Sequence, residues 1–280
     1  MLDFISFGSG SSGNCYYLFT ETDGLLIDIG VGIRSLRKSF HDYGLDFFSG
    51  FKNILITHDH ADHIKSVGSL SKKLDIPVWT TAAVHGGIDK NYSVKCKLMK
   101  HNRKIIEKNV PFNVGEFHVT PFAVPHDSTD NVGYEISCQG VVFTILTDVG
   151  HVTEEMKALI RRTNYLVVEA NYDSHMLANG PYPVHLQERI RCGTGHLSNT
   201  QCAQLLTENY TENLRHVWLC HLSHENNKPE IAHACVVDTM KSAGIEVGVK
   251  VDVEQLSRKL PSTEERTGGK ECRTRGARSQ

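Results

Sequence analysis

The residues best suited to chemistry lie between positions 57 and 63, where the chain reads Thr-His-Asp-His-Ala-Asp-His. The apolar run before them predicts a buried strand, and residues 63–74 after them have helical spacing. Imidazole and carboxylate groups suit zinc, and also manganese or iron. Four ligand-type side chains within six positions are poor core material. We therefore predict that this turn binds metal through His58, His60, Asp62 and His63, the alternative being a solvated polar loop.

Four further ligand-type residues fall at the ends of other predicted strands. Asp28 lies at the end of the 25–29 string, His126 follows 120–124, Asp148 ends 141–147, and His221 ends 216–220. Each of these residues alone could be an ordinary turn residue. Loops at strand ends are where α/β proteins place their sites, so one sheet edge could gather all four. Together with the 57–63 turn they predict one metal site.

The elements that must position these residues alternate along the chain. A hairpin is expected around Thr22-Asp23-Gly24, between strands at 15–20 and 25–29, and strand candidates follow at 54–57, 117–124, 133–137, 141–147, 165–169 and 216–220. Helices are expected at 31–43, 63–74, 153–162, 199–209 and 229–242. Hairpins mixed with strand–helix alternation favour an α/β sandwich with mixed sheets over a purely parallel sheet.

The 280 residues include 40% hydrophobic side chains, enough for a folded core. We expect one folded domain over 1–256 and a disordered basic tail over 257–280. The net charge of −2 does not indicate a polyanion binder, although a local basic groove would be hidden in the total. The eight cysteines lack C-x-x-C spacing, and no signal peptide or membrane-length apolar run is evident. A cytoplasmic protein is therefore expected.

The ordered set of motifs from residue 3 to residue 251 resembles the metallo-β-lactamase superfamily. The resemblance implies a four-layered αβ/βα sandwich with two mixed sheets and two divalent metal ions, zinc or manganese. It implies that His58, His60 and His126 hold one ion, that Asp62, His63 and His221 hold the other, and that Asp148 bridges them. Asp28 would orient a ligand histidine through its N–H. Asp148 stands where many true β-lactamases carry a cysteine ligand, which argues against a β-lactam substrate.

Five further motifs are similar to those of the WalJ/YycJ group of bacterial proteins, a relative of the nuclease branch with ribonucleases Z and J. They are the small-residue turn 7–14, Pro-His-Asp at 125–127, Glu-Ala-Asn-Tyr-Asp at 169–173, Gly-His-Leu-Ser-Asn at 195–199 and His-Leu-Ser-His-Glu-Asn-Asn at 221–227. This resemblance implies phosphodiester hydrolysis, as a 5′-to-3′ exonuclease acting on DNA. No membrane association and no obligate protein partner are expected.

The residues support a nuclease independently of the resemblance. Of two late histidines the metals need only one, so His196 could protonate a phosphate or leaving oxygen, with Asp62 as a candidate proton acceptor. Ser198 and Asn199 stand before a predicted helix, where they could bind a phosphate or only cap the helix. Arg189 could meet substrate phosphates or simply lie on an exposed helix face.

Other interpretations remain open from sequence. His224 competes with His221 as a ligand, although His221 directly follows the strand. The basic stretch from Lys95 to Lys108 is either a solvated face or a nucleic-acid contact. The same metal cage could serve thioester or lactone hydrolysis. A non-catalytic, metal-stabilised regulatory or binding protein is the alternative from a different class.

Overall fold

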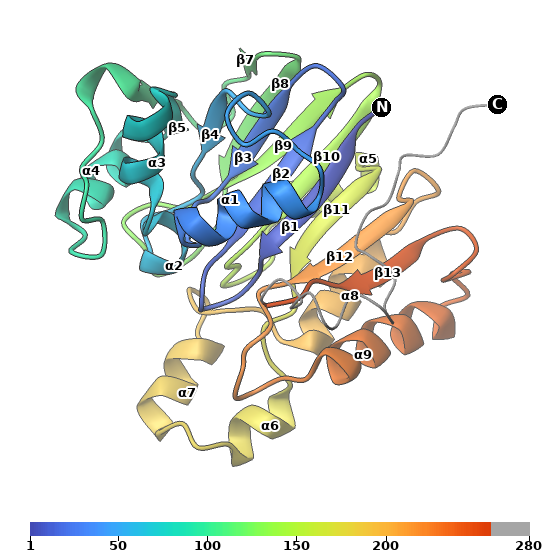
Figure 1. Ribbon diagram of the computed structural model, residues 1–280. Coiled ribbons are helices and arrows are strands. Elements are labelled where there is room, and N and C mark those ends of the chain that lie inside the picture. The colour runs from blue at the N-terminus through green and yellow to red at the C-terminus, as the bar shows by residue number, and fades with distance from the viewer. Residues whose placement is uncertain (259–280) are drawn as a thin grey trace. The chain divides into compact units, whose positions relative to one another are not determined.

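The computed structural model describes residues 1–258, which form two compact units (Figure 1). Of the described residues, unit 1 comprises Met1–His118, Ser128–Asp130, Ser257 and Arg258, and unit 2 comprises Val119–Asp127 and Asn131–Leu256. The tail predicted over 257–280 lies outside the described residues, apart from its first two. Across residues 1–258, no helix is long and apolar enough to cross a membrane.

Unit 1 contains a sheet whose strands follow their sequence order. They are β1 (Asp3–Gly8), β2 (Cys15–Phe19), β3 (Gly24–Ile27), β4 (Asn53–Leu55), β5 (Val78–Thr80) and β6 (Arg103–Ile105). The first three strands pair antiparallel, which confirms the predicted hairpin between β2 and β3. From β3 to β6 the pairing is parallel, so the sheet is mixed. The next strand along the chain, β7 (Phe112–Val114), pairs in the second sheet instead.

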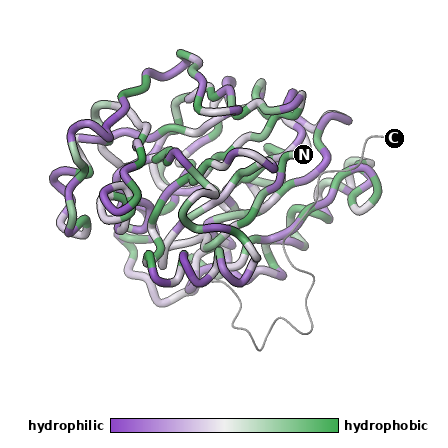
Figure 2. The backbone as a smooth tube through the Cα atoms, turned by 45° about the horizontal axis from the view of Figure 1, so that its top comes forward, coloured by the Kyte–Doolittle hydropathy of each residue, from purple (hydrophilic) through white to green (hydrophobic). Residues whose placement is uncertain are grey.

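Helices of unit 1 bury their apolar sides in one core. They are α1 (Ile33–Asp42), α2 (Ala61–Ile64), α3 (Val67–Leu74) and α4 (Ala82–Lys90). The polar 3₁₀ turn η1 (Lys100–Asn102) also belongs to unit 1. Phe40 of α1 lies with its ring centroid 5.0 Å from Phe7 of β1 and 4.9 Å from Tyr17 of β2. Such helices are amphipathic, and helical segments in Figure 2 change repeatedly between hydrophobic and hydrophilic colours.

One predicted helix is divided. The single helix expected over 63–74 is wrong, because α2 ends at Ile64 and α3 starts at Val67. The backbone N–H of Ser66 donates to the carbonyl of Ile29, 3.0 Å away, instead of continuing a helical ladder. The break anchors the chain beside the end of β3, which is where Asp28 lies.

Unit 2 holds a second mixed sheet. Its order is β13 (Asp252–Gln255), β12 (His216–Cys220), β11 (Tyr165–Glu169), β10 (Val141–Leu146), β9 (Val132–Cys138), β8 (Phe117–Ala123) and β7 (Phe112–Val114). β9 and β10 form an antiparallel hairpin, and β10 to β13 pair in parallel. The carboxyl ends of the parallel strands therefore meet at one edge of this sheet.

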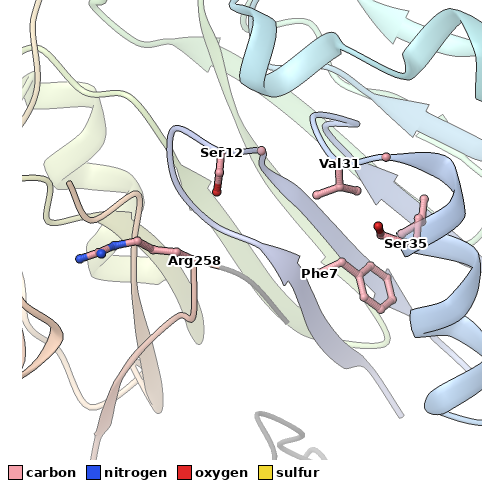
Figure 3. Close-up of a pocket in the computed structure, with 8 residues that line it drawn as sticks. Phe7, Ser12, Val31, Ser35 and Arg258 are labelled. Atoms are coloured by element: carbon pink, nitrogen blue, oxygen red, sulfur yellow. The ribbon is translucent and has the colours of Figure 1, made fainter. Parts of the chain in front are cut away.

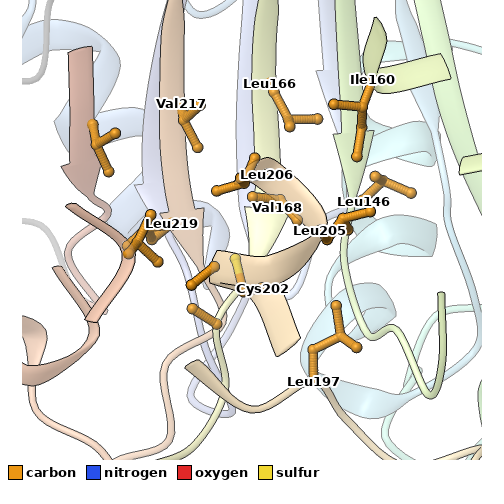
Figure 4. Packing of buried hydrophobic residues seen from close by; sticks show 14 of the residues in the cluster. Leu146, Ile160, Leu166, Val168, Leu197, Cys202, Leu205, Leu206, Val217 and Leu219 are labelled. Atoms are coloured by element: carbon orange, nitrogen blue, oxygen red, sulfur yellow. The ribbon is translucent and has the colours of Figure 1, made fainter. Parts of the chain in front are cut away.

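The helices of unit 2 are α5 (Glu154–Arg162), α6 (Ser174–Asn179), α7 (Val184–Arg191), α8 (Asn199–Asn209) and α9 (Pro229–Ser242). Leu205 and Leu206 of α8 join a buried cluster with Val168 of β11 and Leu219 of β12 (Figure 4). This core fixes α8 against the sheet, so the turn that precedes α8 is held near the end of β11.

The strand ends have an unusual backbone. Asp28, Asp148 and His221 adopt left-handed conformations, with φ of 59°, 54° and 53°. This region is uncommon for residues other than glycine and costs free energy. All three residues are among the predicted metal-site residues, so the chain is turned sharply where their side chains leave the sheet edge.

Candidate metal centre

Unit 1 gathers the ligand-type residues of the 57–63 turn at the end of β4. His58 and His63 are fully buried, and their ring centroids lie 4.0 Å apart. The ring of His60 is 4.7 Å from that of His58. A carboxylate oxygen of Asp62 lies 3.7 Å from Nε2 of His63. The structure thus brings together the four residues that the sequence singled out in this turn.

Asp28 organises this turn from the end of the neighbouring strand. Its carboxylate is fully buried and accepts hydrogen bonds from the backbone N–H and the hydroxyl of Thr57, both at 2.9 Å. The same carboxylate accepts from Nδ1 of His63 at 2.7 Å. Because Nδ1 then carries the proton, Nε2 of His63 is the nitrogen suited to bind a metal.

Asn14 is a residue that sequence reasoning did not select, although it belongs to the small-residue turn 7–14. Its Oδ1 accepts from the backbone N–H of Gly10 at 2.7 Å, which fixes the orientation of the amide. Its Nδ2 therefore faces the turn, 2.9 Å from Nε2 of His63 and 3.3 Å from a carboxylate oxygen of Asp62. Asn14 holds these two candidate ligands side by side.

A pocket of about 280 Å³ is lined in part by this small-residue turn, with Phe7, Ser12, Val31, Ser35 and Arg258 among its wall residues (Figure 3). None of the candidate ligands lines it. The pocket is therefore distinct from the ligand cluster, although its wall residue Gly13 directly precedes Asn14.

Asp59, within the histidine turn, has a structural task instead. Its carboxylate accepts from the backbone N–H of Thr129 at 3.1 Å. It also packs against Gly87 of α4 so closely that a Cβ at Gly87 would lie 1.9 Å from the carboxylate oxygen. The backbone carbonyl of Asp59 accepts from the amide of Asn91 at 2.8 Å. These contacts tie the turn to α4.

Unit 2 assembles a second cluster at the ends of β10, β11 and β12. Ligand atoms of Asp148, Glu169, His196 and His221 all lie within 4.8 Å of one another. Three of these were singled out from the sequence. Glu169 was not predicted as a site residue, although a carboxylate that ends the buried strand Tyr165–Glu169 is the same signal that selected Asp148.

Glu169 is fully buried and receives four hydrogen bonds. One oxygen accepts from Nδ1 of His196 at 2.7 Å and from Nδ1 of His221 at 3.1 Å. The other accepts from the backbone N–H groups of Val149 at 2.8 Å and Leu197 at 3.1 Å. Both histidines are therefore held through Nδ1 by one carboxylate.

The charges within this cluster stabilise one another. Burial would raise the pKa of Glu169, but the charge of His196 and the hydrogen bonds from both histidines lower it below its ordinary value. Burial would likewise lower the pKa of His196, but the Glu169 carboxylate raises it. The pair is thus favoured in its charged form within a buried setting.

His126 follows β8 and reaches the same cluster. Its Nδ1 donates to the backbone carbonyl of Gly195 at 2.9 Å, and its Nε2 lies 3.7 Å from a carboxylate oxygen of Asp148. The ring centroid of His126 is 5.1 Å from that of His196. Unit 2 therefore brings together His126, Asp148, His196 and His221.

The donor sets of both units fit divalent metal ions. In protein metal sites, a ligating histidine usually donates its second ring N–H to an acceptor of the surrounding protein. That pattern holds for four candidate ligands and also for His196: His58 contacts the hydroxyl of Thr57 at 3.0 Å, His63 contacts Asp28, His126 contacts Gly195, and His196 and His221 contact Glu169. In every case Nδ1 makes the hydrogen bond, so Nε2 is the ring nitrogen suited to bind a metal ion or to exchange a proton.

The β-lactamase superfamily domain model matches residues 24–221, which span the strand ends of both clusters. This chain belongs to the metallo-β-lactamase superfamily. The predicted fold class, an α/β sandwich with two mixed sheets, is confirmed, as is the resemblance to the WalJ/YycJ group. The fold implies divalent metal ions, and the protein is a metal-dependent hydrolase.

Individual superfamily members align with most of the chain. It is 30% identical to "Exodeoxyribonuclease YycJ" of Bacillus anthracis over 93% of its own length and 97% of that protein. It is 32% identical to "Exodeoxyribonuclease WalJ" of Streptococcus pneumoniae, over 89% and 92% of the two chains. The fold is shared with the metallo-β-lactamase fold protein YhfI of Bacillus subtilis, with a TM-score of 0.67, 16% identity and coverage of 93% and 98%.

The residues predicted to contact substrate lie around the start of α8. Ser198 caps this helix, and its hydroxyl accepts from the backbone N–H of Gln201. Asn199 is buried, and its amide exchanges hydrogen bonds at 2.8 and 3.0 Å with that of Asn227. Arg189 is exposed and forms an ion pair with Asp127 at 2.6 Å. Ser198 and Asn199 thus have structural partners, and substrate contact by these two residues and by Arg189 stays a prediction.

The competing histidine His224 lies at the surface. Its side chain is 73% exposed and contacts Glu225. His221, in contrast, is buried against Glu169 and Asp148. Asn171 supports His221 further, because its amide donates to the backbone carbonyl of His221 at 2.8 Å.

Proposed function

We propose that the protein is a dinuclear metal-dependent phosphodiesterase that degrades DNA as a 5′-to-3′ exonuclease, with Zn²⁺ or Mn²⁺ as its metal. The relatives named exodeoxyribonuclease cover nine-tenths of the chain, which supports DNA as the substrate. The observation that carries the choice of a phosphodiester is the Glu169 carboxylate, which holds His196 in addition to the candidate ligand His221.

The proposed ligand scheme uses both clusters. His58, His60 and His126 would hold one ion, Asp62, His63 and His221 would hold the other, and Asp148 would contribute to both. Asp28 fixes the tautomer of His63. The scheme is supported by the chemistry of the side chains and by the engaged Nδ1 atoms.

Divalent ions supply the nucleophile at neutral pH and neutralise charge on the phosphate. The chain's own residues then manage the protons. Asp62 accepts the proton of the attacking water. His196, whose Nδ1 is held by Glu169, donates a proton from Nε2 to the leaving 3′-oxygen as the bond from phosphorus to that oxygen breaks. The hydroxide of the water ends on phosphorus, which becomes the 5′-phosphate of the shortened strand. The proton from His196 completes the 3′-hydroxyl of the released 5′-mononucleotide, so each bond consumes one water.

The test is hydrolysis of single- and double-stranded DNA by the manganese-loaded protein, with 5′-labelled and internally labelled substrates and Asp148→Ala as the blank. We expect stepwise release of labelled 5′-mononucleotides by the wild type alone. The Asp148→Ala protein should also lose more metal than any other single ligand variant, which elemental analysis measures. Full metal content in that variant would remove Asp148 from the bridging position.

His196→Ala separates the roles of the histidines. We expect this variant to keep its metal and to lose most turnover. An equal loss of metal would make His196 a ligand. Absence of cleavage of DNA and of RNA in the same format would favour thioester or lactone substrates. A wild-type metal content below about one ion per chain would favour a non-catalytic binding protein.

A further inference from the structure

The segment that follows α4 is strongly basic and was not used by the proposed chemistry. From residue 90 to residue 106 the chain carries six Lys and Arg residues and no Asp or Glu. Its neighbour Asp89 is neutralised by Arg103, whose guanidinium bonds both carboxylate oxygens at 2.6 and 2.7 Å. The local charge of this segment is therefore positive, although the whole chain has a net charge of −2.

An exposed aromatic side chain stands within this segment, between Lys90 and Lys95. Tyr92 is 86% exposed, more than any other large hydrophobic residue described. It stands in a fixed turn, because Oδ1 of Asn91 accepts from the backbone N–H of Ser93 at 2.9 Å and from its hydroxyl at 2.7 Å. An exposed aromatic ring on a fixed turn is available to a planar ligand at little cost in conformational entropy.

The segment folds back on itself, so that Lys97 lies beside the turn that carries Tyr92. The ammonium of Lys97 donates to the carbonyl of Asn91 at 2.8 Å and to that of Ile88 at 3.3 Å. Arg103 also donates to the carbonyl of Leu98 at 3.2 Å. Lys90, Lys95 and Lys100 are exposed. We call Lys90, Tyr92, Lys95, Lys97 and Lys100 the Tyr92 surface, and Figure 1 shows α4 and its following loop at the edge of unit 1.

The Tyr92 surface is tied to the candidate ligand turn within unit 1. The amide of Asn91 donates to the backbone carbonyl of Asp59, which stands between His58 and His60. A strand bound on the Tyr92 surface therefore contacts a segment that is directly hydrogen-bonded to the ligand turn.

We propose that the Tyr92 surface binds the DNA strand in single-stranded form, with Tyr92 stacking on an unpaired base and Lys90, Lys95 and Lys100 contacting phosphates. This inference rests on the proposed function, because it names how the same substrate is held. Lysines attract phosphates through counterion release, and an exposed aromatic ring stacks on a base of any sequence once that base is unpaired. Duplex DNA keeps its bases stacked, so the ring favours single strands.

The test compares DNA binding by Lys95→Ala/Lys100→Ala, Tyr92→Ala and Tyr92→Phe with that of the wild type. The probe is a fluorescent, phosphorothioate-linked oligothymidylate, which resists hydrolysis by the metal-loaded protein. Lys97 and Arg103 are left unchanged because they hold the segment together. The control is Lys241→Ala/Lys250→Ala, which removes two surface charges from unit 2. Lys250 precedes β13 and so lies at the start of the parallel β12–β13 pair, whereas His221 follows the other end of β12.

We expect Lys95→Ala/Lys100→Ala to weaken binding and to reduce the slope of log K against log salt by about 1.4, since each phosphate contact to a single strand contributes about 0.7. Tyr92→Ala should weaken single-strand binding about tenfold and duplex binding less, whereas Tyr92→Phe should bind as the wild type does. The control should keep the wild-type slope. If Lys95→Ala/Lys100→Ala and Tyr92→Ala both bind the probe with the affinity and slope of the control, the proposed role of the Tyr92 surface is wrong.

Hydrolysis of thymidine 5′-p-nitrophenyl phosphate, which is too short to reach beyond the metal centre, separates the two proposals. We expect the surface variants to hydrolyse this small diester at the wild-type rate. If the wild type degrades DNA and the variants bind like the wild type, the proposal for the Tyr92 surface is wrong and the exonuclease proposal is supported. If the variants lose binding while the wild type cleaves no DNA, the exonuclease proposal is wrong and DNA binding by the Tyr92 surface is supported.

Discussion

Nδ1 of His63 donates to the buried carboxylate of Asp28 across 2.7 Å. The two residues leave adjacent strands of unit 1, since Asp28 follows β3 and His63 lies in α2, beyond the end of β4. Asp28 also accepts two hydrogen bonds from Thr57. One carboxylate therefore fixes both the tautomer of a candidate ligand and the path of the turn that carries it.

Asp28→Asn should weaken metal binding about 10- to 100-fold, as is typical when the partner of a ligating histidine is lost. Asparagine tolerates the left-handed backbone at this position, so the change removes the charge without new strain. Titration against a competing chelator measures the effect. Asp75→Asn is the matched control, because Asp75 also has a positive φ, of 51°, and is exposed. Equal affinities in the two variants would show that Asp28 does not support a ligand.

Glu169→Gln should destabilise the metal-free protein by about 1–3 kcal/mol and reduce turnover. The carboxylate accepts from four N–H groups, and the amide of glutamine would turn a donor toward two of them. Urea unfolding with chelator present gives the stability change. Glu135→Gln, which alters a carboxylate paired with Arg162 outside the cluster, should cost less. A stability loss no larger than in this control would contradict the importance of the four-donor arrangement.

Two neighbouring glycines of α4 should respond in opposite directions to alanine. Gly86→Ala should stabilise the protein by about 0.5–1 kcal/mol, because a Cβ there meets nothing within 4 Å and alanine favours a helix. Gly87→Ala should destabilise it by about 1–3 kcal/mol, because its Cβ would overlap the carboxylate of Asp59. Urea midpoints at constant slope measure both changes. A neutral Gly87→Ala would mean that the histidine turn can move away from α4 freely.

Cys192 should be the most reactive thiol among the described cysteines, of which it alone is exposed. Its hydrogen bond with Thr194 lowers the pKa of the thiol below the ordinary value of 9.0, so a larger thiolate fraction is present at neutral pH. Iodoacetamide labelling followed by peptide mass analysis should modify Cys192 before Cys15 or Cys202. Thr194→Val should shift the pH profile of labelling upward. Labelling of Cys192 no faster than that of the buried thiols would contradict the prediction.

Much of the candidate site could be predicted from local pattern. His58, His60, Asp62 and His63 follow an apolar strand, and His126, Asp148 and His221 each follow another. A strand's period and its ending are properties of neighbouring residues, so the sequence by itself determined which side chains leave the sheet edges. It also determined the mixed character of the sheets, through the hairpin spacing and the strand–helix alternation.

Only the tertiary structure decided which groups hold those side chains. Glu169 lies 27 residues from His196 and 52 from His221, and Asn14 lies 49 residues from His63. Such pairings depend on how strands are ordered in a sheet, which no local period encodes. The same holds for Ser66, whose bond to Ile29 divided a helix that periodicity had made continuous. Asn199 is a further example. Its position at the start of a helix could not show that its amide is buried against Asn227, because that partner lies in a distant loop.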